Sequence, residues 1–167
     1  MNKIIFLTII LLIQSFHSLG SVNGKGIICK CLDCKIDQLD PSSYIPNNKP
    51  TEIGFHFKIN KVAIYYISKI GDDIKVSENI ETTLRKKKSF TANEDKIEWT
   101  YKDDLNIYAY ELDRKTLILK KINITKTKIY NVRMCEAFTE IDFFRNMEQL
   151  SKKYQDIYNK KPKKNKI

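Results

Sequence analysis

The clearest strand signal in the chain is the stretch EIGFHFKINKVAIYYISKI, residues 52–70. In its first half every second residue is apolar, which predicts a strand with one buried face and one solvated face. On the solvated face we expect His56 to be a surface residue. The second half, KVAIYYISKI, is apolar on both faces, as is typical of a central strand. A tight turn at Asn60-Lys61 would join the two strands, and Gly71-Asp72-Asp73 would end the second one.

Outward from this pair, further β-prone runs are separated by short turn-prone segments. They are residues 26–32, 82–90, 96–101, 105–112, 116–122 and 127–136. Many short strands joined by short turns predict a mainly β domain, an antiparallel up-and-down meander of about eight strands. The meander would form either a curved sheet or a calycin-like barrel.

The end of the chain changes to a helical period. Apolar residues recur at three- and four-residue steps, which predicts one C-terminal amphipathic helix over residues 140–159. Thr139 would cap its start together with Asp142, and Phe138 would pack against Phe143.

The first 20 residues have the layout of a secretory signal peptide. Lys3 lies beside the amino terminus, residues 4–13 are almost wholly apolar, and small residues precede Ser21. The apolar run is about half the length of a membrane span, and an uncleaved anchor is the alternative. We therefore expect a signal peptide at 1–20, a single β-rich domain with its helix at 21–159, and a Lys-rich tail at 160–167. No second long apolar run follows, so no integral span is expected after signal removal.

Several segments together resemble small exported proteins of AT-rich marine bacteria, a group with signal peptides and no established activity. These segments are GKGIICKC, EIGFHF, KIEW, YELDRKTLIL, MCEAF and the Lys-rich end. The resemblance implies a small, exported, β-rich protein. It transfers no functional residue.

The four cysteines are Cys29, Cys31, Cys34 and Cys135. In an oxidising compartment such cysteines form disulfides, and we favour Cys29–Cys135 together with Cys31–Cys34. The first bridge would tie the first strand to the last, which a closed meander brings side by side. Strict alternation places Cys135 opposite Val132 and Met134, so we expect a bulge in the last strand. A four-thiolate zinc site and a redox-active C-x-x-C motif are the alternatives.

Catalytic motifs are missing from the sequence. His56 is the only histidine after the signal peptide, and we find no nucleophile elbow, zinc-protease motif or phosphate-binding glycine loop. We therefore name no catalytic residue, no metal ligand and no cofactor, and we leave enzymatic activity open.

Charge and aromatic residues supply the remaining candidates. The net charge is +10, and residues 152–167 alone hold seven lysines against Asp156. Basic clusters that could bind an anionic envelope component are Arg85, Lys86, Lys87 and Lys88, and Lys160, Lys161, Lys163 and Lys164. Four aromatic residues on neighbouring strands either face a ligand or pack in the core: Trp99, Tyr101, Tyr108 and Tyr110.

These features favour an exported, periplasmic or extracellular, non-enzymatic protein of the cell envelope. Its partner would be a small apolar ligand or an anionic envelope component. A Cys-cluster metal-binding protein is the first alternative, and a carboxylate-based hydrolase is the second.

Overall fold

The computed structural model describes residues 22–32, 51–59, 61–78, 90–102 and 106–160. These residues form one antiparallel sheet of nine strands in the order β4-β3-β2-β1-β9-β8-β7-β6-β5, followed by one C-terminal helix. The elements are β1 (Lys25–Cys31), β2 (Glu52–Lys58), β3 (Lys61–Ile70), β4 (Asp73–Glu78), β5 (Phe90–Ala92), β6 (Lys96–Lys102), β7 (Ile107–Asp113), β8 (Ile118–Asn123), β9 (Lys128–Thr139) and α3 (Glu140–Asn159). The predicted mainly β meander with a C-terminal helix is confirmed.

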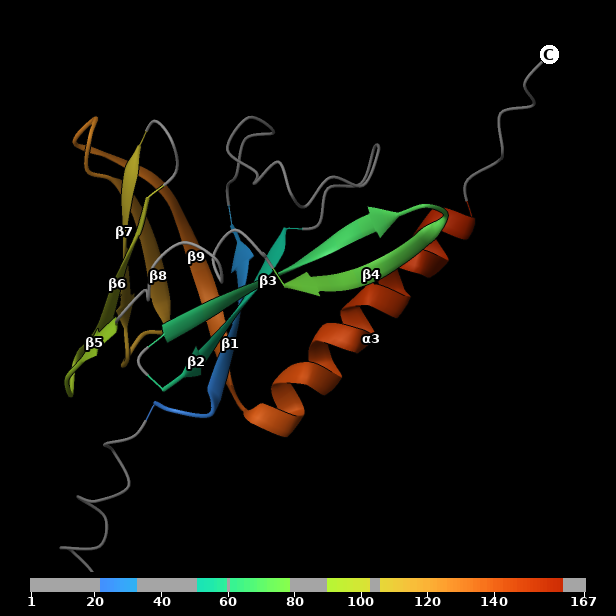
Figure 1. The fold of residues 1–167 in the computed structure, drawn as a ribbon, viewed down its shortest axis with the longest axis horizontal. Coiled ribbons are helices and arrows are strands. Elements are labelled where there is room, and N and C mark those ends of the chain that lie inside the picture. Colours follow the sequence, from blue (N-terminus) through green and yellow to red (C-terminus); the bar gives the residue numbers. More distant parts are fainter. Residues whose placement is uncertain (1–21, 33–50, 60, 79–89, 103–105, 161–167) are drawn as a thin grey trace, which may run out of the picture.

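The sheet curls into a half-barrel, with β4 and β5 at the two ends of the strand order (Figure 1). The curl brings the inner faces of distant strands together. Phe55 of β2 lies 5.2 Å from Trp99 of β6 and 5.6 Å from Tyr110 of β7, measured between ring centroids. Edge-to-face aromatic contacts of this kind add to the burial of large apolar surfaces. The concave side of the sheet is therefore the main hydrophobic core.

The first and last strands pair directly, as predicted. Cys29 of β1 lies opposite Cys135 of β9, and the two form a disulfide. The predicted bulge is also present, because β8 pairs its Lys121 with Asn131 but the next residue with Ile129. The bulge moves Ile129 to the outer face, where Val132 and Met134 also lie and are exposed. Cys135 faces inward.

Helix α3 covers the outer face of the half of the sheet that contains β1 to β4 (Figure 1). Two glycines make room for it. A Cβ atom added to Gly26 would lie 2.3 Å from the ring of Phe143, and one added to Gly54 would lie 2.9 Å from Phe143 and from Met147. Because real Cβ atoms do not approach so closely, the strands need glycine where the helix packs.

The prediction of an exposed His56 is wrong. Its side chain is 1% exposed, because the rings of Phe143 and Phe144 lie 5.5 and 5.2 Å from the imidazole. Strand alternation alone indicates a second face but not what covers it. Here the helix covers it.

The predicted helix boundaries and cap are confirmed. Thr139 Oγ1 accepts a hydrogen bond from the Asp142 amide, and its hydroxyl donates to the Asp142 carboxylate.

Near its C-terminal end, α3 forms hydrogen bonds with the outer edge of β4. Ser151 Oγ donates to the Ile74 carbonyl oxygen at 2.6 Å, and the Ile74 amide donates to Gln155 Oε1 at 2.7 Å. These bonds occupy backbone groups that an edge strand otherwise leaves open to other chains.

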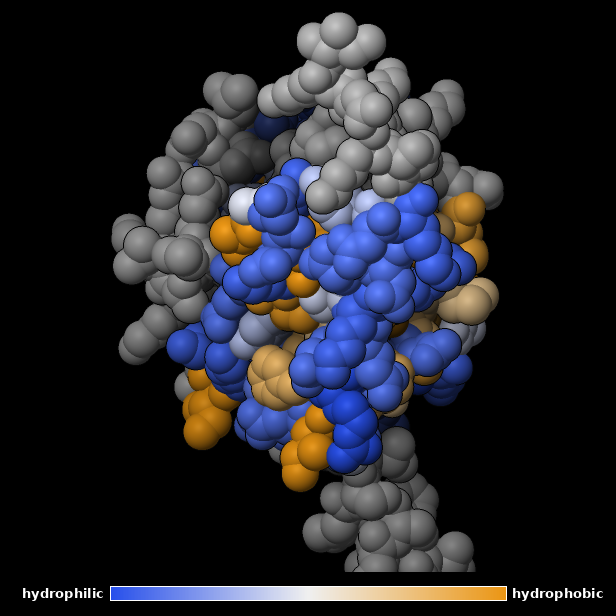
Figure 2. Space-filling model, turned by 90° about the vertical axis from the view of Figure 1, so that its right-hand side faces the viewer, coloured by the Kyte–Doolittle hydropathy of each residue, from blue (hydrophilic) through white to orange (hydrophobic). Residues whose placement is uncertain are grey.

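The sheet has nine strands where about eight are predicted, and the additional strand is β4. The predicted strand 82–90 lies outside the described residues except at Phe90, which begins β5. Figure 2 shows the side that carries α3 and β4, where hydrophilic side chains predominate and apolar ones are exposed in separate places. None of the helical residues that the structure describes forms a segment with the length and hydropathy of a transmembrane span.

Candidate functional site

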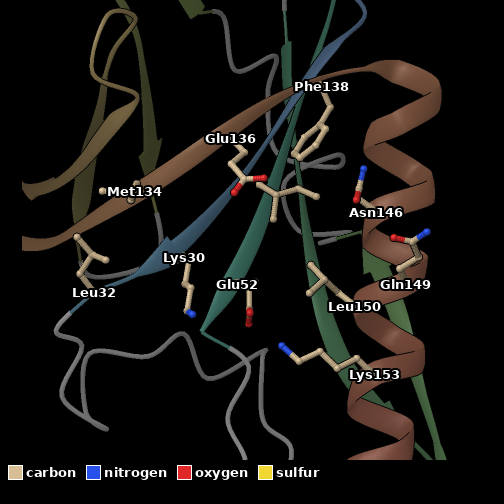
Figure 3. Close-up of a pocket in the computed structure, with 11 residues that line it drawn as sticks. Lys30, Leu32, Glu52, Met134, Glu136, Phe138, Asn146, Gln149, Leu150 and Lys153 are labelled. Atoms are coloured by element: carbon tan, nitrogen blue, oxygen red, sulfur yellow. The ribbon is translucent and has the colours of Figure 1, made fainter.

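A pocket of about 430 Å³ lies where the outer face of β1 and β9 meets α3 (Figure 3). Its volume falls within the range of small-molecule sites. The apolar lining residues are Ile28, Leu32, Met134, Phe138 and Leu150. The polar lining residues are Lys30, Glu52, Glu136, Asn146, Gln149 and Lys153.

The pocket follows from two sequence periods. On β1 and β9 it is lined by every second residue, 28, 30 and 32 on one strand and 134, 136 and 138 on the other. The register places Ile28 opposite Glu136 and Lys30 opposite Met134, so the two rows lie side by side. On α3 the lining residues 146, 149, 150 and 153 recur at the three- and four-residue steps of one helical face.

Apolar side chains in this pocket are accessible to a ligand. Leu32 and Met134 are 57% and 52% exposed, whereas Ile28, Phe138 and Leu150 are half-buried against the core under the helix. A ligand that covers the exposed pair gains about 25 cal/mol for each Å² of apolar surface removed from water. This surface supplies a driving force for binding.

Glu52 is a buried carboxylate at the wall of the pocket, with 8% of its surface exposed. Its Oε2 accepts three hydrogen bonds, from the Tyr154 hydroxyl at 2.6 Å, from the Thr51 amide at 3.1 Å and from the Thr51 hydroxyl at 3.3 Å. Burial, followed by the hydrogen bond to Glu52, raises the pKa of Tyr154, so this hydroxyl stays a donor. Oε1 accepts no hydrogen bond from any described residue.

The pocket is charged differently at its two ends. In Figure 3 the amines of Lys30 and Lys153 point toward the end where the Glu52 carboxylate lies, and Glu136 lies beside Phe138 at the other end. Lys30 is the cross-strand partner of Glu52, but no ion pair within 4.0 Å joins either lysine to another residue that the structure describes. Two amines are thus available for an anionic group.

The four predicted aromatic residues lie on the inner face, away from this pocket. Trp99 and Tyr110 stack with centroids 5.1 Å apart, and both are buried in the main core with Tyr108. Tyr101 is partly buried against that core and stacks on Tyr108 at 6.3 Å. Core packing accounts for them, and contact with a ligand stays a prediction.

The cysteines are oxidised where the structure describes them. Cys29 and Cys135 are bonded to each other, and Cys31 is also disulfide-bonded. Its predicted partner Cys34 lies outside the described residues. A thiolate zinc site would therefore lack at least three of its four ligands, and within the described ranges no three His, Cys, Asp or Glu side chains cluster in a way that could hold a metal ion.

The predicted basic clusters fall almost wholly outside the described residues. These are residues 85–88 and residues 161–164 of the tail. Lys160 is described and caps α3, where its backbone amide donates to the Asp156 carbonyl oxygen. Binding of an anionic envelope component by these lysines stays a prediction.

No pattern in the sequence predicts the pocket residues as a group. One signal was available. Lys30 lies between Cys29 and Cys31, and Glu136 follows Cys135, so both charged residues belong to the face opposite the cysteines on two strands that the predicted disulfide makes neighbours. The face of α3 that meets these strands could not be assigned from its period alone.

Comparison with family models, with curated proteins and with solved structures finds no match for this chain.

Proposed function

We propose that this chain is an exported, non-enzymatic protein of the cell envelope that binds a small ligand in the pocket between α3 and the strands β1 and β9. The pocket carries the proposal, because it combines accessible apolar side chains with two lysine amines that make no described ion pair. Small-molecule sites combine apolar surface with polar groups that orient the ligand, and this pocket supplies both.

Export rests on two observations. The first 20 residues have the composition of a secretory signal, and Cys29 and Cys135 form a disulfide. Structural disulfides persist in oxidising compartments and are rare in the cytosol. A periplasmic or extracellular location agrees with both.

Thermal-shift screening of the mature protein against envelope extracts and small-molecule fractions tests the binding proposal. A fraction that stabilises the wild type should lose its effect on a Gln149→Trp variant, because the indole would fill the mouth of the pocket. Lys152→Trp is the matched control, since Lys152 is exposed on the same helix and does not line the pocket. If no fraction stabilises the wild type, or if both variants respond like it, the pocket is not the binding site.

A carboxylate-based hydrolase is the second candidate, because Glu52 and Glu136 both line the pocket. Glycosidase-like chemistry requires two carboxyl groups that flank one bond, about 5–10 Å apart. In Figure 3 the two side chains belong to different ends of the pocket. Hydrolysis of glycoside or ester substrates that disappears in both Glu52→Gln and Glu136→Gln would favour this candidate over simple binding.

A further inference from the structure

We infer that the ligand of this pocket is a short peptide with free ends and an apolar side chain, bound with its carboxylate at Lys30 and Lys153 and its ammonium at Glu136. The inference rests on the proposed function and names the ligand class for the same pocket.

The strand register fits a peptide of about three residues. Glu136 lies opposite Ile28 on β1, and the backbone of Lys30 is two residues, or about 7 Å, further along that strand at the usual rise. The Lys30 side chain carries its amine beyond this point, toward the end of the pocket where Glu52 lies. An extended peptide advances about 3.3–3.6 Å per residue, so its first and third residues are about 7 Å apart. A tripeptide can therefore reach both ends of the pocket.

The lysine end suits a carboxylate that has an N–H group beside it. Two amines against the single Glu52 carboxylate leave this end positive. Glu52 is fixed by the Tyr154 hydroxyl on Oε2, while Oε1 accepts no bond from the described residues. The last peptide N–H of a bound chain would supply the donor that Oε1 lacks. A simple fatty acid has no such donor.

The middle of the pocket offers apolar contacts and amide groups together. Ile28, Phe138 and Leu150 are half-buried and would pack against the central side chain of the peptide. Asn146 donates through Nδ2 to the Asp142 carbonyl oxygen, which leaves its Oδ1 to accept from a peptide N–H. Gln149 carries both a donor and an acceptor for a second peptide group.

Isothermal titration of the oxidised mature protein with the tripeptide Ala-Leu-Ala tests the inference. Acetylation of its amino end or amidation of its carboxyl end removes one charge each, and each change should weaken binding about tenfold because a charge-assisted contact is lost. Gly-Gly-Gly should also bind more weakly, since it has no apolar side chain to bury.

Matched variants assign each end. Glu136→Gln should bind Ala-Leu-Ala as weakly as the wild type binds the acetylated peptide, and it should no longer distinguish the two. The double variant Lys30→Gln/Lys153→Gln should bind Ala-Leu-Ala as weakly as the wild type binds the amidated peptide. It should no longer distinguish the free peptide from the amidated one. Lys152→Gln, which is outside the pocket, should behave like the wild type.

Several results would overturn the inference: no binding of Ala-Leu-Ala, equal affinity for the free and the capped peptides, or discrimination that persists in Glu136→Gln. If dodecanoate binds in the pocket while no peptide does, the proposed function stands and the peptide class is wrong. If Gln149→Trp also leaves dodecanoate binding unchanged, the pocket itself is wrong.

Discussion

Gly26→Ala tests the packing that places α3 against the sheet and so forms one wall of the pocket. The new Cβ would lie 2.3 Å from two ring atoms of Phe143 and 2.7 Å from its Cβ. Reaching ordinary van der Waals contact requires a shift of roughly 1 Å, and the interior of a protein has little free space. The ring of Phe143 also lies among His56, Tyr65 and Phe144, with centroids 5.1–5.5 Å away.

Overpacking of a filled core typically costs about 1–3 kcal/mol. Because a rigid ring meets the new atom, we expect a loss near 3 kcal/mol in the free energy of unfolding, measured by urea denaturation with circular dichroism. The melting temperature should fall by about 10 °C. Gly54→Ala should cost less, because one of its nearest atoms is the Met147 sulfur at 2.9 Å, in a flexible side chain.

A double-mutant cycle identifies the cause. Phe143→Ala alone should cost about 3–5 kcal/mol. Adding Gly26→Ala to it should cost clearly less than in the wild type, because the two ring atoms at 2.3 Å are gone and only the Cβ of residue 143, at 2.7 Å, remains. A Gly26→Ala variant as stable as the wild type would show that the Phe143 ring does not restrict this position. An equal cost of the alanine in the Phe143→Ala background and in the wild type would show that the ring is not the cause.

Three further predictions concern stability. Replacing both Cys29 and Cys135 by alanine should lower the free energy of unfolding by about 2–5 kcal/mol, because the disulfide closes a loop of 106 residues; a loss below 1 kcal/mol in urea would contradict this. Burial lowers the pKa of His56 more than the nearby Glu140 raises it, so on acidification the unfolded chain takes up the proton before the folded chain does. The contribution of the neutral imidazole to the free energy of unfolding should therefore be complete above about pH 6.5 and fall as the pH drops below that value. A His56→Gln variant should show a shallower loss between pH 7 and 5.5, and an unchanged slope would argue against the buried imidazole. Ser151→Ala should cost about 1–2 kcal/mol by leaving the Ile74 carbonyl without its donor, and a neutral result in the same urea assay would show that water replaces the hydroxyl.

Local signals in the sequence predict most of the fold. The helix is predicted by its period and by the Thr139 cap, because both depend on residues a few positions apart. The Cys29–Cys135 disulfide is predicted because a meander that closes on itself places its first and last strands together. Strand β4 is missed because Gly71-Asp72-Asp73 marks a stop, and the six residues Asp73–Glu78, the first of which belongs to that stop, are too few and too mixed in character to indicate a strand.

The pocket depends on long-range packing, and sequence patterns do not show it. His56 looks like a surface residue on an alternating strand, and only Gly26 and Gly54 indicate that something packs closely on that face. Glycine in a strand marks close approach but does not name the partner. Once Phe143 is seen to fill that space, the position of α3 follows, and with it the groove between the helix and β9.

Native mass spectrometry of the protein recovered from the envelope under non-denaturing conditions would show whether the pocket holds a ligand. We expect a chain that begins at Ser21, carries its disulfides and retains a small-molecule adduct, while the Gln149→Trp variant has lost the adduct and Lys152→Trp has kept it. A wild-type protein without any adduct, or the same adduct on Gln149→Trp, would contradict the claim that this pocket binds a ligand.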